Sequence, residues 1–149
     1  PIEGDRTRTL LGAGAGFFAA AAAHAGWRGL AAGVLEATVQ ALCEVAACGA
    51  DELSAWLGPC IGPRQFEVGA DVQAAFGPAA ARHFTARPRP DGSLRWLADL
   101  PALARDRLHA AGVLQITGGT WCTVEDPSKF FSFRRDRVTG RMAAAVWLR

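Results

Sequence analysis

The chain has 149 residues, of which 50% are hydrophobic and 20% charged, and its formal net charge is +2. This length and composition suffice for one folded domain with a hydrophobic core, and they exclude wholesale disorder. Such a small net charge gives no basis for electrostatic binding to nucleic acid or to an anionic membrane, so we expect neither partner.

The start of the chain and its cysteines indicate a cytoplasmic protein. Residues 1–9 are mostly polar and charged, so they do not form a secretory signal peptide. The longest apolar run, 10–23, is too short to span a bilayer. The cysteines have no Cys-x-x-Cys spacing, which makes reduced thiols the expectation.

The first third of the chain is expected to hold a strand and a long helix. A short apolar run at 17–23 predicts a buried strand. A helix is predicted from 30 to about 48, because polar residues four positions apart form one solvent-facing stripe opposite a stripe of Val, Ala and Leu. Gly49 is a natural C-terminal stop for this helix.

The middle of the chain alternates short elements with stiff loops. Residues 54–57 predict a strand that runs into the loop 58–63, where two prolines and two glycines restrict the backbone. A second strand is predicted at 65–68, and Asp71 is expected to cap the short helix that follows. Residues 82–95 contain two prolines and an Asp-Gly turn, so we expect an irregular surface excursion there.

The last third is expected to combine one helix with several strands. A short apolar segment at 96–98 leads to a helix that begins near Pro101. Strands are predicted at 113–117, at 130–133 and at 142–148. Strands and helices mix without a regular βαβ alternation, so the sequence predicts an α+β fold.

Three residues after the first predicted strand are candidates for a functional site. His24 lies where that strand ends and is a common metal ligand. Trp27 has a ring that can stack on a base, and Arg28, next to a glycine, has a guanidinium that can bind phosphate. The alternatives are a structural histidine, a core tryptophan and a surface ion pair.

Cysteines and further arginines supply the other candidates. A zinc site needs three or four N, S or O ligands, and His24 could combine with Cys60 and Cys122. Alternatively, His24 and Cys60 could act as base and thiol in nucleophilic catalysis. Arg134 and Arg135 lie in a cluster of arginines that could hold an anion or form a solvated turn.

Three motifs resemble those of a known family. The first is His-Ala-Gly-Trp-Arg-Gly at 24–29, and the second is Gly-Pro-x-Ile-Gly-Pro-x-x-Phe-Glu-Val at 58–68. The third is Phe-Ser-Phe-Arg-Arg-Asp-x-x-Thr-Gly-Arg-Met at 131–142, followed by Val-Trp-Leu at 146–148. In this order they resemble the YfiH family, also called multicopper polyphenol oxidoreductase or laccase-like, over roughly residues 19–149.

The resemblance carries expectations about fold and metal ligands. It implies a mixed α/β fold with β-sheets in a sandwich-like core flanked by helices. It also implies that 1–149 is a single domain, the C-terminal part of a longer YfiH-like domain, with a divergent start at 1–18. The histidine of the first motif is a metal ligand in the family, and it corresponds to His24. The family's other two ligands lie in Val-His-Gly and Ala-Asp-Cys motifs that this chain lacks, and Cys60 is a weaker alternative ligand.

The resemblance also carries expectations about activity. Members are described as zinc-dependent purine nucleoside phosphorylases that cleave adenosine, inosine, guanosine or methylthioadenosine with phosphate, and as adenosine deaminases. We therefore expect a nucleoside and phosphate as ligands, zinc as cofactor, and His24 and Arg28 as catalytic residues. Trp27, Arg134 and Arg135 are expected to bind substrate, the arginines because their guanidinium groups suit anions. The alternatives are copper-linked polyphenol oxidation, hydrolytic editing of a peptidoglycan precursor, and an inactive fragment.

Overall fold

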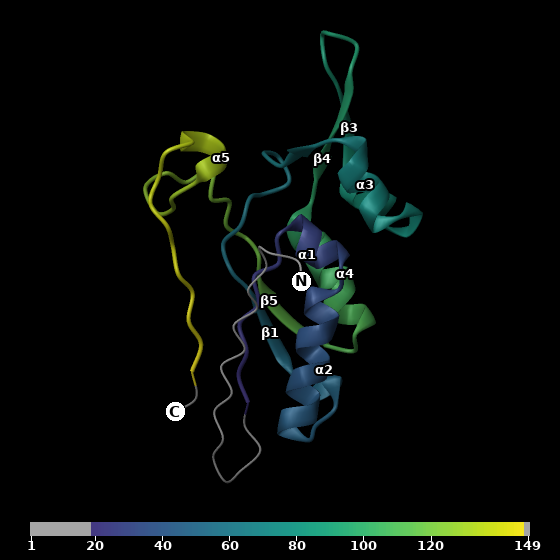
Figure 1. Ribbon diagram of the computed structural model, residues 1–149, viewed down its shortest axis with the longest axis vertical. Coiled ribbons are helices and arrows are strands. Elements are labelled where there is room, and N and C mark those ends of the chain that lie inside the picture. The colour runs from purple at the N-terminus through teal and green to yellow at the C-terminus, as the bar shows by residue number, and fades with distance from the viewer. Residues whose placement is uncertain (1–18, 148–149) are drawn as a thin grey trace. The chain divides into compact units, whose positions relative to one another are not determined.

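The structure, a computed structural model, describes residues 19–147 (Figure 1). Two compact units make up the chain. Of the described residues, unit 1 contains 19–55 together with 104–117 and 143–147, and unit 2 contains 56–103 and 118–142. The expected divergent start at 1–18 lies outside the described residues. Within the described range, no helix is long and apolar enough to cross a membrane.

Unit 1 begins with two consecutive helices. α1 (Trp27–Ala31) and α2 (Val34–Ala46) are separated at Gly33, whose φ of 90° lies in the left-handed region that favours glycine. The prediction of one unbroken helix over 30–48 is therefore wrong. The helical conformation starts earlier, at Trp27, and is interrupted at Gly33.

The core of unit 1 is aliphatic. Leu30 of α1 is fully buried, and Val113, just after the last helix of the unit, is 1% exposed. That helix, α4 (Leu100–Ala110), spans the boundary between the units, and its second half belongs to unit 1. Arg107 Nη1 donates a hydrogen bond to Glu36 Oε1 at 3.0 Å, which ties α4 to α2.

The strand predicted at 17–23 does not form in the part that the structure describes. Residues 19–26 have no regular secondary structure. Positions 19–23 are all alanine, which has low strand propensity, and no described strand pairs with this segment.

A two-stranded sheet forms where the sequence predicts strands. It pairs β1 (Ser54–Leu57) with β5 (Gln115–Gly118), and the 3₁₀ helix η1 (Ala50–Glu52) precedes β1. Ser54 Oγ donates to Gln115 Oε1 at 3.1 Å at the beginning of the two strands. Further along, within unit 2, Cys60 and Cys122 form an isolated parallel bridge.

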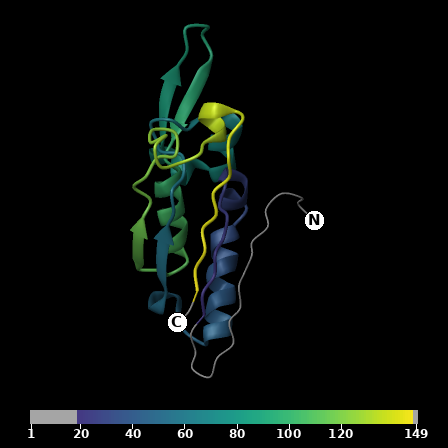
Figure 2. The ribbon, with the colours of Figure 1, turned by 90° about the vertical axis from the view of Figure 1, so that its left-hand side faces the viewer.

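Unit 2 contains a three-stranded antiparallel sheet in the order β2–β4–β3, with α3 beside it (Figures 1 and 2). Its elements are β2 (Glu67–Val68), α3 (Ala70–Phe76), the 3₁₀ helix η2 (Pro78–His83), β3 (Phe84–Pro88) and β4 (Leu94–Ala98). The expected irregular excursion at 82–95 is wrong, because β3 and β4 form a hairpin there. Pro88 is tolerated because it ends an edge strand, and Gly92 supplies the positive φ of 81° in the turn.

The register of the hairpin separates a buried face of the sheet from an open one. Phe84 pairs with Ala98, and these residues are 8% and 0% exposed. The next pair, Thr85 opposite Leu97, points to the other face because side chains alternate along a strand.

Two helix starts in unit 2 differ in how they are capped. The prediction that Asp71 caps α3 is wrong. The N-cap position is Gly69, and no side chain caps the helix. Asp99 precedes α4, and its Oδ1 accepts the Ala102 N–H at 2.9 Å. This carboxylate satisfies a backbone donor that would otherwise lack a partner in the first turn of α4.

The two strands predicted near the C-terminus also do not form as far as residue 147, where the described range ends. A short helix, α5 (Phe133–Asp136), begins where the strand at 130–133 was expected, and Ser132 Oγ caps it by accepting the Arg135 N–H. Residues 141–147 are exposed and have no regular structure. A strand needs a hydrogen-bonded neighbour, and none of the described strands pairs with these segments. The combination of helices with an antiparallel sheet confirms the predicted α+β class.

Candidate functional site

The His24 side chain is exposed and lies against a glycine that begins α1. A Cβ at Gly26 would be 3.2 Å from His24 Nε2, so the imidazole occupies space that another residue type would fill. Gly26 is the N-cap of α1, and its carbonyl accepts the Leu30 N–H at 2.9 Å. The glycine thus fixes both the start of the helix and the room for the ring.

Trp27 and Arg28 occupy the first two positions of α1. The Arg28 Cζ lies 4.3 Å from the centroid of the Trp27 ring, a cation–π arrangement that places the guanidinium over the indole. Such stacking uses the flat face of the guanidinium and leaves its N–H edge for bidentate contact with an oxyanion. In unit 1, the guanidinium of the exposed Arg28 thus stacks on the Trp27 indole, and His24 lies three positions before that tryptophan.

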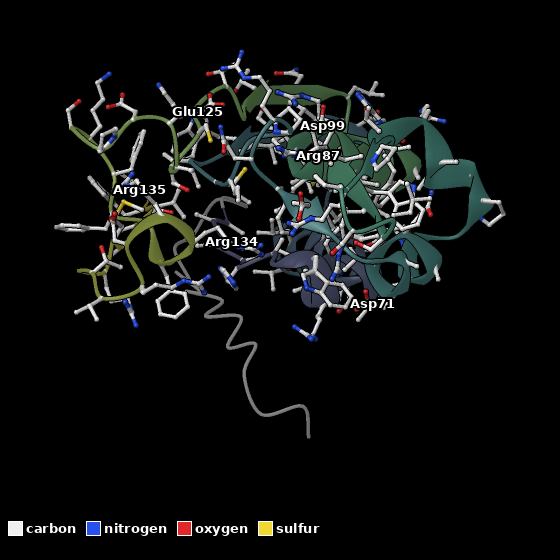
Figure 3. All side chains as sticks on the ribbon, turned by 90° about the horizontal axis from the view of Figure 1, so that it is seen from above. Asp71, Arg87, Asp99, Glu125, Arg134 and Arg135 are labelled. Atoms are coloured by element: carbon white, nitrogen blue, oxygen red, sulfur yellow. The ribbon has the colours of Figure 1, made fainter. Side chains whose placement is uncertain are left out.

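Arg135 lies on α5 in unit 2 (Figure 3), and its side chain is held by the 123–130 loop and by Asp136. Its Nη1 donates to the carbonyls of Thr123 at 2.9 Å and Val124 at 3.3 Å, and its Nη2 donates to the Phe130 carbonyl at 3.0 Å. Its Nε and Nη2 also bind Asp136 at 2.8 and 2.7 Å, a pair that raises the pKa of Arg135 and lowers that of Asp136. Each of its five N–H donors has an acceptor, an arrangement that fastens the 123–130 loop to α5.

Arg134, its neighbour, is exposed and less constrained. Its Nη1 donates to the Glu67 carbonyl at 3.3 Å, and its Cζ lies 5.5 Å from the centroid of the Phe66 ring. Arg134 keeps more donors than Arg135 for an anion. Both arginines belong to unit 2, whereas His24 and its neighbours belong to unit 1.

Cys60 and Cys122 lie at the backbone bridge described above. The Thr123 N–H donates to the Cys60 carbonyl at 2.9 Å, and the Gly62 N–H donates to Cys122 Sγ at 3.2 Å. The Cys60 thiol donates to the Ile61 carbonyl at 3.5 Å. Across residues 19–147, no group of three or more His, Cys, Asp or Glu side chains is arranged to hold a metal ion.

Sequence reasoning missed a cavity of about 250 Å³ within unit 2. Its lining residues come from the loop after β1, from η2 and from the open face of the sheet: Pro63, Arg64, Arg82, His83, Thr85, Leu97 and Asp99. These residues lie far apart in the sequence and meet only because of the hairpin, which the sequence did not indicate. The run of basic residues at 82–89 was the available signal.

An ion pair fixes one wall of this cavity. Arg64 Nε and Nη2 donate to the two carboxylate oxygens of Glu125 at 3.0 and 2.7 Å, and Gln65 Nε2 donates to Glu125 Oε1 at 3.2 Å. The bond from Arg64 lowers the pKa of Glu125. The bidentate geometry orients the guanidinium although its side chain is 80% exposed.

Comparisons with known proteins define the class to which this α+β chain belongs. The family model described as multi-copper polyphenol oxidoreductase laccase matches residues 13–149. The chain belongs to this family, and the relationship to YfiH proteins predicted from the three motifs is confirmed.

Individual relatives agree with this assignment. A purine nucleoside phosphorylase of Pseudomonas aeruginosa is 53% identical over 128 residues, which cover 86% of this chain and 51% of that protein. The purine nucleoside phosphorylase YfiH of Escherichia coli is 50% identical, with 86% and 50% covered. A solved Neisseria meningitidis protein gives a TM-score of 0.66 at 47% identity, over 76% of this chain and 45% of that chain. The chain spans about half the length of the curated relatives it matches.

Proposed function

We propose that this chain belongs to a cytoplasmic, zinc-dependent enzyme that cleaves purine nucleosides with phosphate. The observation that carries the proposal is the similarity, along 86% of the chain, to proteins named purine nucleoside phosphorylase at 53% and 50% identity. The matched region includes the corner with His24, Trp27 and Arg28. Adenosine, inosine, guanosine and methylthioadenosine are the substrates we propose.

Phosphate binding is the role that Arg28 is best placed to perform. In phosphorolysis, a phosphate oxygen forms a bond to C1′ of the ribose while the bond from C1′ to the base nitrogen breaks and its electron pair leaves with the base. Arg28 would hold the phosphate through the N–H edge of its guanidinium, which Trp27 keeps in place. Trp27 would also contact the base with the part of its indole that Arg28 does not cover.

Arg134 and Arg135 would play different parts in substrate binding. Arg134 is exposed and would add charge complementary to the phosphate. Arg135 would act indirectly, because its donors already bind three carbonyls and Asp136. We therefore propose Arg135 as a positioning residue for the 123–130 loop.

Zinc would supply a Lewis acid, and His24 is the residue we propose as its ligand in this chain. A zinc site needs at least three protein ligands. His24 alone does not complete that set, and residues 19–147 contain no group of three or more His, Cys, Asp or Glu side chains that could hold a metal ion. We propose that the remaining ligands come from the part of the family's domain that this chain does not span.

The test is phosphate-dependent release of free base from inosine and adenosine by a protein of the full length of the relatives. We expect His24→Ala to abolish activity and to lower the zinc content measured by elemental analysis. Arg28→Ala should raise the KM for phosphate more than that for the nucleoside. Full activity of His24→Ala would remove this histidine from the site, and base release that is independent of phosphate would refute phosphorolysis.

Copper-linked phenol oxidation is the second candidate, and the description of the matching family model favours it. The same preparation separates the two activities. Stoichiometric copper together with oxidation of a phenolic substrate would support the oxidase, whereas zinc without phenol oxidation would exclude it. Inosine formed from adenosine without phosphate would identify deamination as a further activity.

A further inference from the structure

Two of the four cysteines meet at the end of α2. Cys43 lies in the last turn of that helix, and Cys48 is the second residue after it. A hydrogen bond joins their side chains, and both residues are partly exposed. The pair belongs to unit 1 and takes no part in the proposed reaction. Two thiols in contact at a fixed turn are the arrangement from which a disulfide forms.

The backbone after α2 turns back so that these two side chains approach each other. Ala47 has φ 51° and ψ 43°, in the left-handed region, and its N–H donates to the Cys43 carbonyl. The Cys48 N–H donates to the same carbonyl at 3.2 Å. A hydrogen bond that reaches back five positions across a left-handed residue is typical of a Schellman motif, in which the side chains at the two ends come into contact. The turn therefore determines how far apart the two thiols lie.

Alanine is an unusual residue at the centre of this turn. Glycine commonly occupies the position, because a Cβ is disfavoured in the left-handed region. The chain just after the turn is held by hydrogen bonds of its own: the Gly49 N–H donates to Glu52 Oε1 at 2.8 Å, and the Glu52 N–H donates to the Gly49 carbonyl at 3.1 Å. Cys48 is thus fixed on one side by α2 and on the other by the start of η1.

The surroundings of the pair favour uncharged sulfur atoms. Desolvation raises the pKa of the Cys48 thiol most, and the neighbouring Cys43, Glu52 and Asp51 raise it further. A reduced pair that is not stabilised as thiolate forms a disulfide that is harder to reduce than one made from acidic thiols. A disulfide carries no charge, so the nearby carboxylates do not oppose it.

We propose that Cys43 and Cys48 form a reversible disulfide with each other when the protein meets a low-molecular-weight disulfide, RSSR. One cysteine, as its thiolate, attacks a sulfur of RSSR, and the RS⁻ that leaves takes up the proton of that thiol. The second cysteine, as its thiolate, then attacks the protein sulfur of the mixed disulfide, and a second RSH leaves with the second proton. The two protein thiols are oxidised to one disulfide, and RSSR is reduced to two RSH.

The test treats the full chain with bis(2-hydroxyethyl) disulfide, which is uncharged and is not repelled by the acidic residues beside the pair. Remaining thiols are alkylated before digestion. Because Glu44 lies between Cys43 and Cys48, cleavage after glutamate places them in the separate peptides 37–44 and 45–52. A disulfide keeps these peptides together, and mass spectrometry then finds one species about 2 Da lighter than their sum.

The other two cysteines provide a comparison within the same digest. Cys60 lies in peptide 53–67 and Cys122 in peptide 68–125, so every possible link gives a different mass. The sulfur of Cys122 accepts the Gly62 N–H, and no printed contact joins it to the Cys60 sulfur. We expect the link between 37–44 and 45–52 to form before any other, and to be lost on reduction with dithiothreitol.

Substitutions at Ala47 change the turn and keep every cysteine. Proline cannot adopt a positive φ, so Ala47→Pro moves Cys48 away from Cys43 and should slow formation of the link about tenfold or more. Ala47→Gly is the matched control, because glycine favours the left-handed conformation. It should form the link at least as fast as the wild type.

Three results would overturn the proposal. The first is no link between 37–44 and 45–52 at a reagent concentration that oxidises the urea-unfolded chain, and the second is a link between Cys60 and Cys122 that forms earlier. The third is an equal rate in Ala47→Pro and the wild type. Thermal unfolding shows whether Ala47→Pro is folded; if it is not, a slower rate in Ala47→Gly than in the wild type contradicts the role of the turn.

Discussion

Replacement of Gly26 by alanine tests whether the room beside His24 matters for function. The added Cβ would lie 3.2 Å from His24 Nε2, closer than ordinary van der Waals contact, so the imidazole has to move by a few tenths of an ångström. The backbone itself accepts alanine, because Gly26 has φ −62° and ψ 163°. The substitution therefore perturbs the ring and not the fold.

The expected effects on stability and activity differ in size. Alanine is a poorer N-cap than glycine, but it also restricts the unfolded chain, so we expect the free energy of unfolding to change by less than about 0.5 kcal/mol. If His24 is the metal ligand that we propose, its displacement by a few tenths of an ångström should lower kcat about tenfold, given that misplacement by about 1 Å costs about a hundredfold.

The assay combines thermal unfolding with zinc content and phosphorolysis in the full-length protein. Gly26→Ser is the matched control, because it adds the same Cβ together with a hydroxyl that can cap α1. We expect it to be more stable than Gly26→Ala and equally impaired in activity. Wild-type zinc content and kcat in both variants would refute the idea that this glycine positions the histidine.

Three further predictions concern stability and loop order. Leu30→Ala empties a fully buried site and should lower the free energy of unfolding by about 2–5 kcal/mol in chemical denaturation; a loss below about 1 kcal/mol would show that the site collapses. The hydrogen bond from Arg64 lowers the pKa of Glu125, so the stability from this pair is present above the ordinary glutamate pKa and is lost as the pH falls through the lowered value. Arg64→Met should return the Glu125 pKa, measured by NMR titration, toward its ordinary value, and an unchanged value would contradict the pairing. Arg135→Ala should speed amide hydrogen exchange across 123–130, because three carbonyls lose their donor; unchanged exchange would show that other contacts hold the loop.

Local patterns allowed good prediction of some elements. Composition predicts the strands at 54–57 and 113–117, which correspond to β1 and β5 (Gln115–Gly118). The corner with His24 stays a prediction, made because its three candidate side chains lie within five positions. The break at Gly33 was missed because the apolar stripe continues across it and only the backbone angle reveals the change.

Elements that depend on distant partners were predicted poorly. The prolines within 82–95 favour a loop over the hairpin of β3 and β4. Pro88, however, ends an edge strand, where it costs no hydrogen bond to a neighbouring strand. Residues 142–148 have strand-like composition, but strands exist only in pairs, and the described residues provide no partner. The cavity was missed for the same reason, since its walls meet only through the hairpin.

The exposed segment at 141–147 has a consequence for handling the protein. Met142, Val146 and Trp147 are 49%, 40% and 68% exposed, and the backbone around them is in no described sheet. An exposed apolar segment whose backbone belongs to no described sheet can add to the strand edge of a second molecule. We therefore expect this chain to associate more as its concentration rises, so its own properties are best measured in dilute samples.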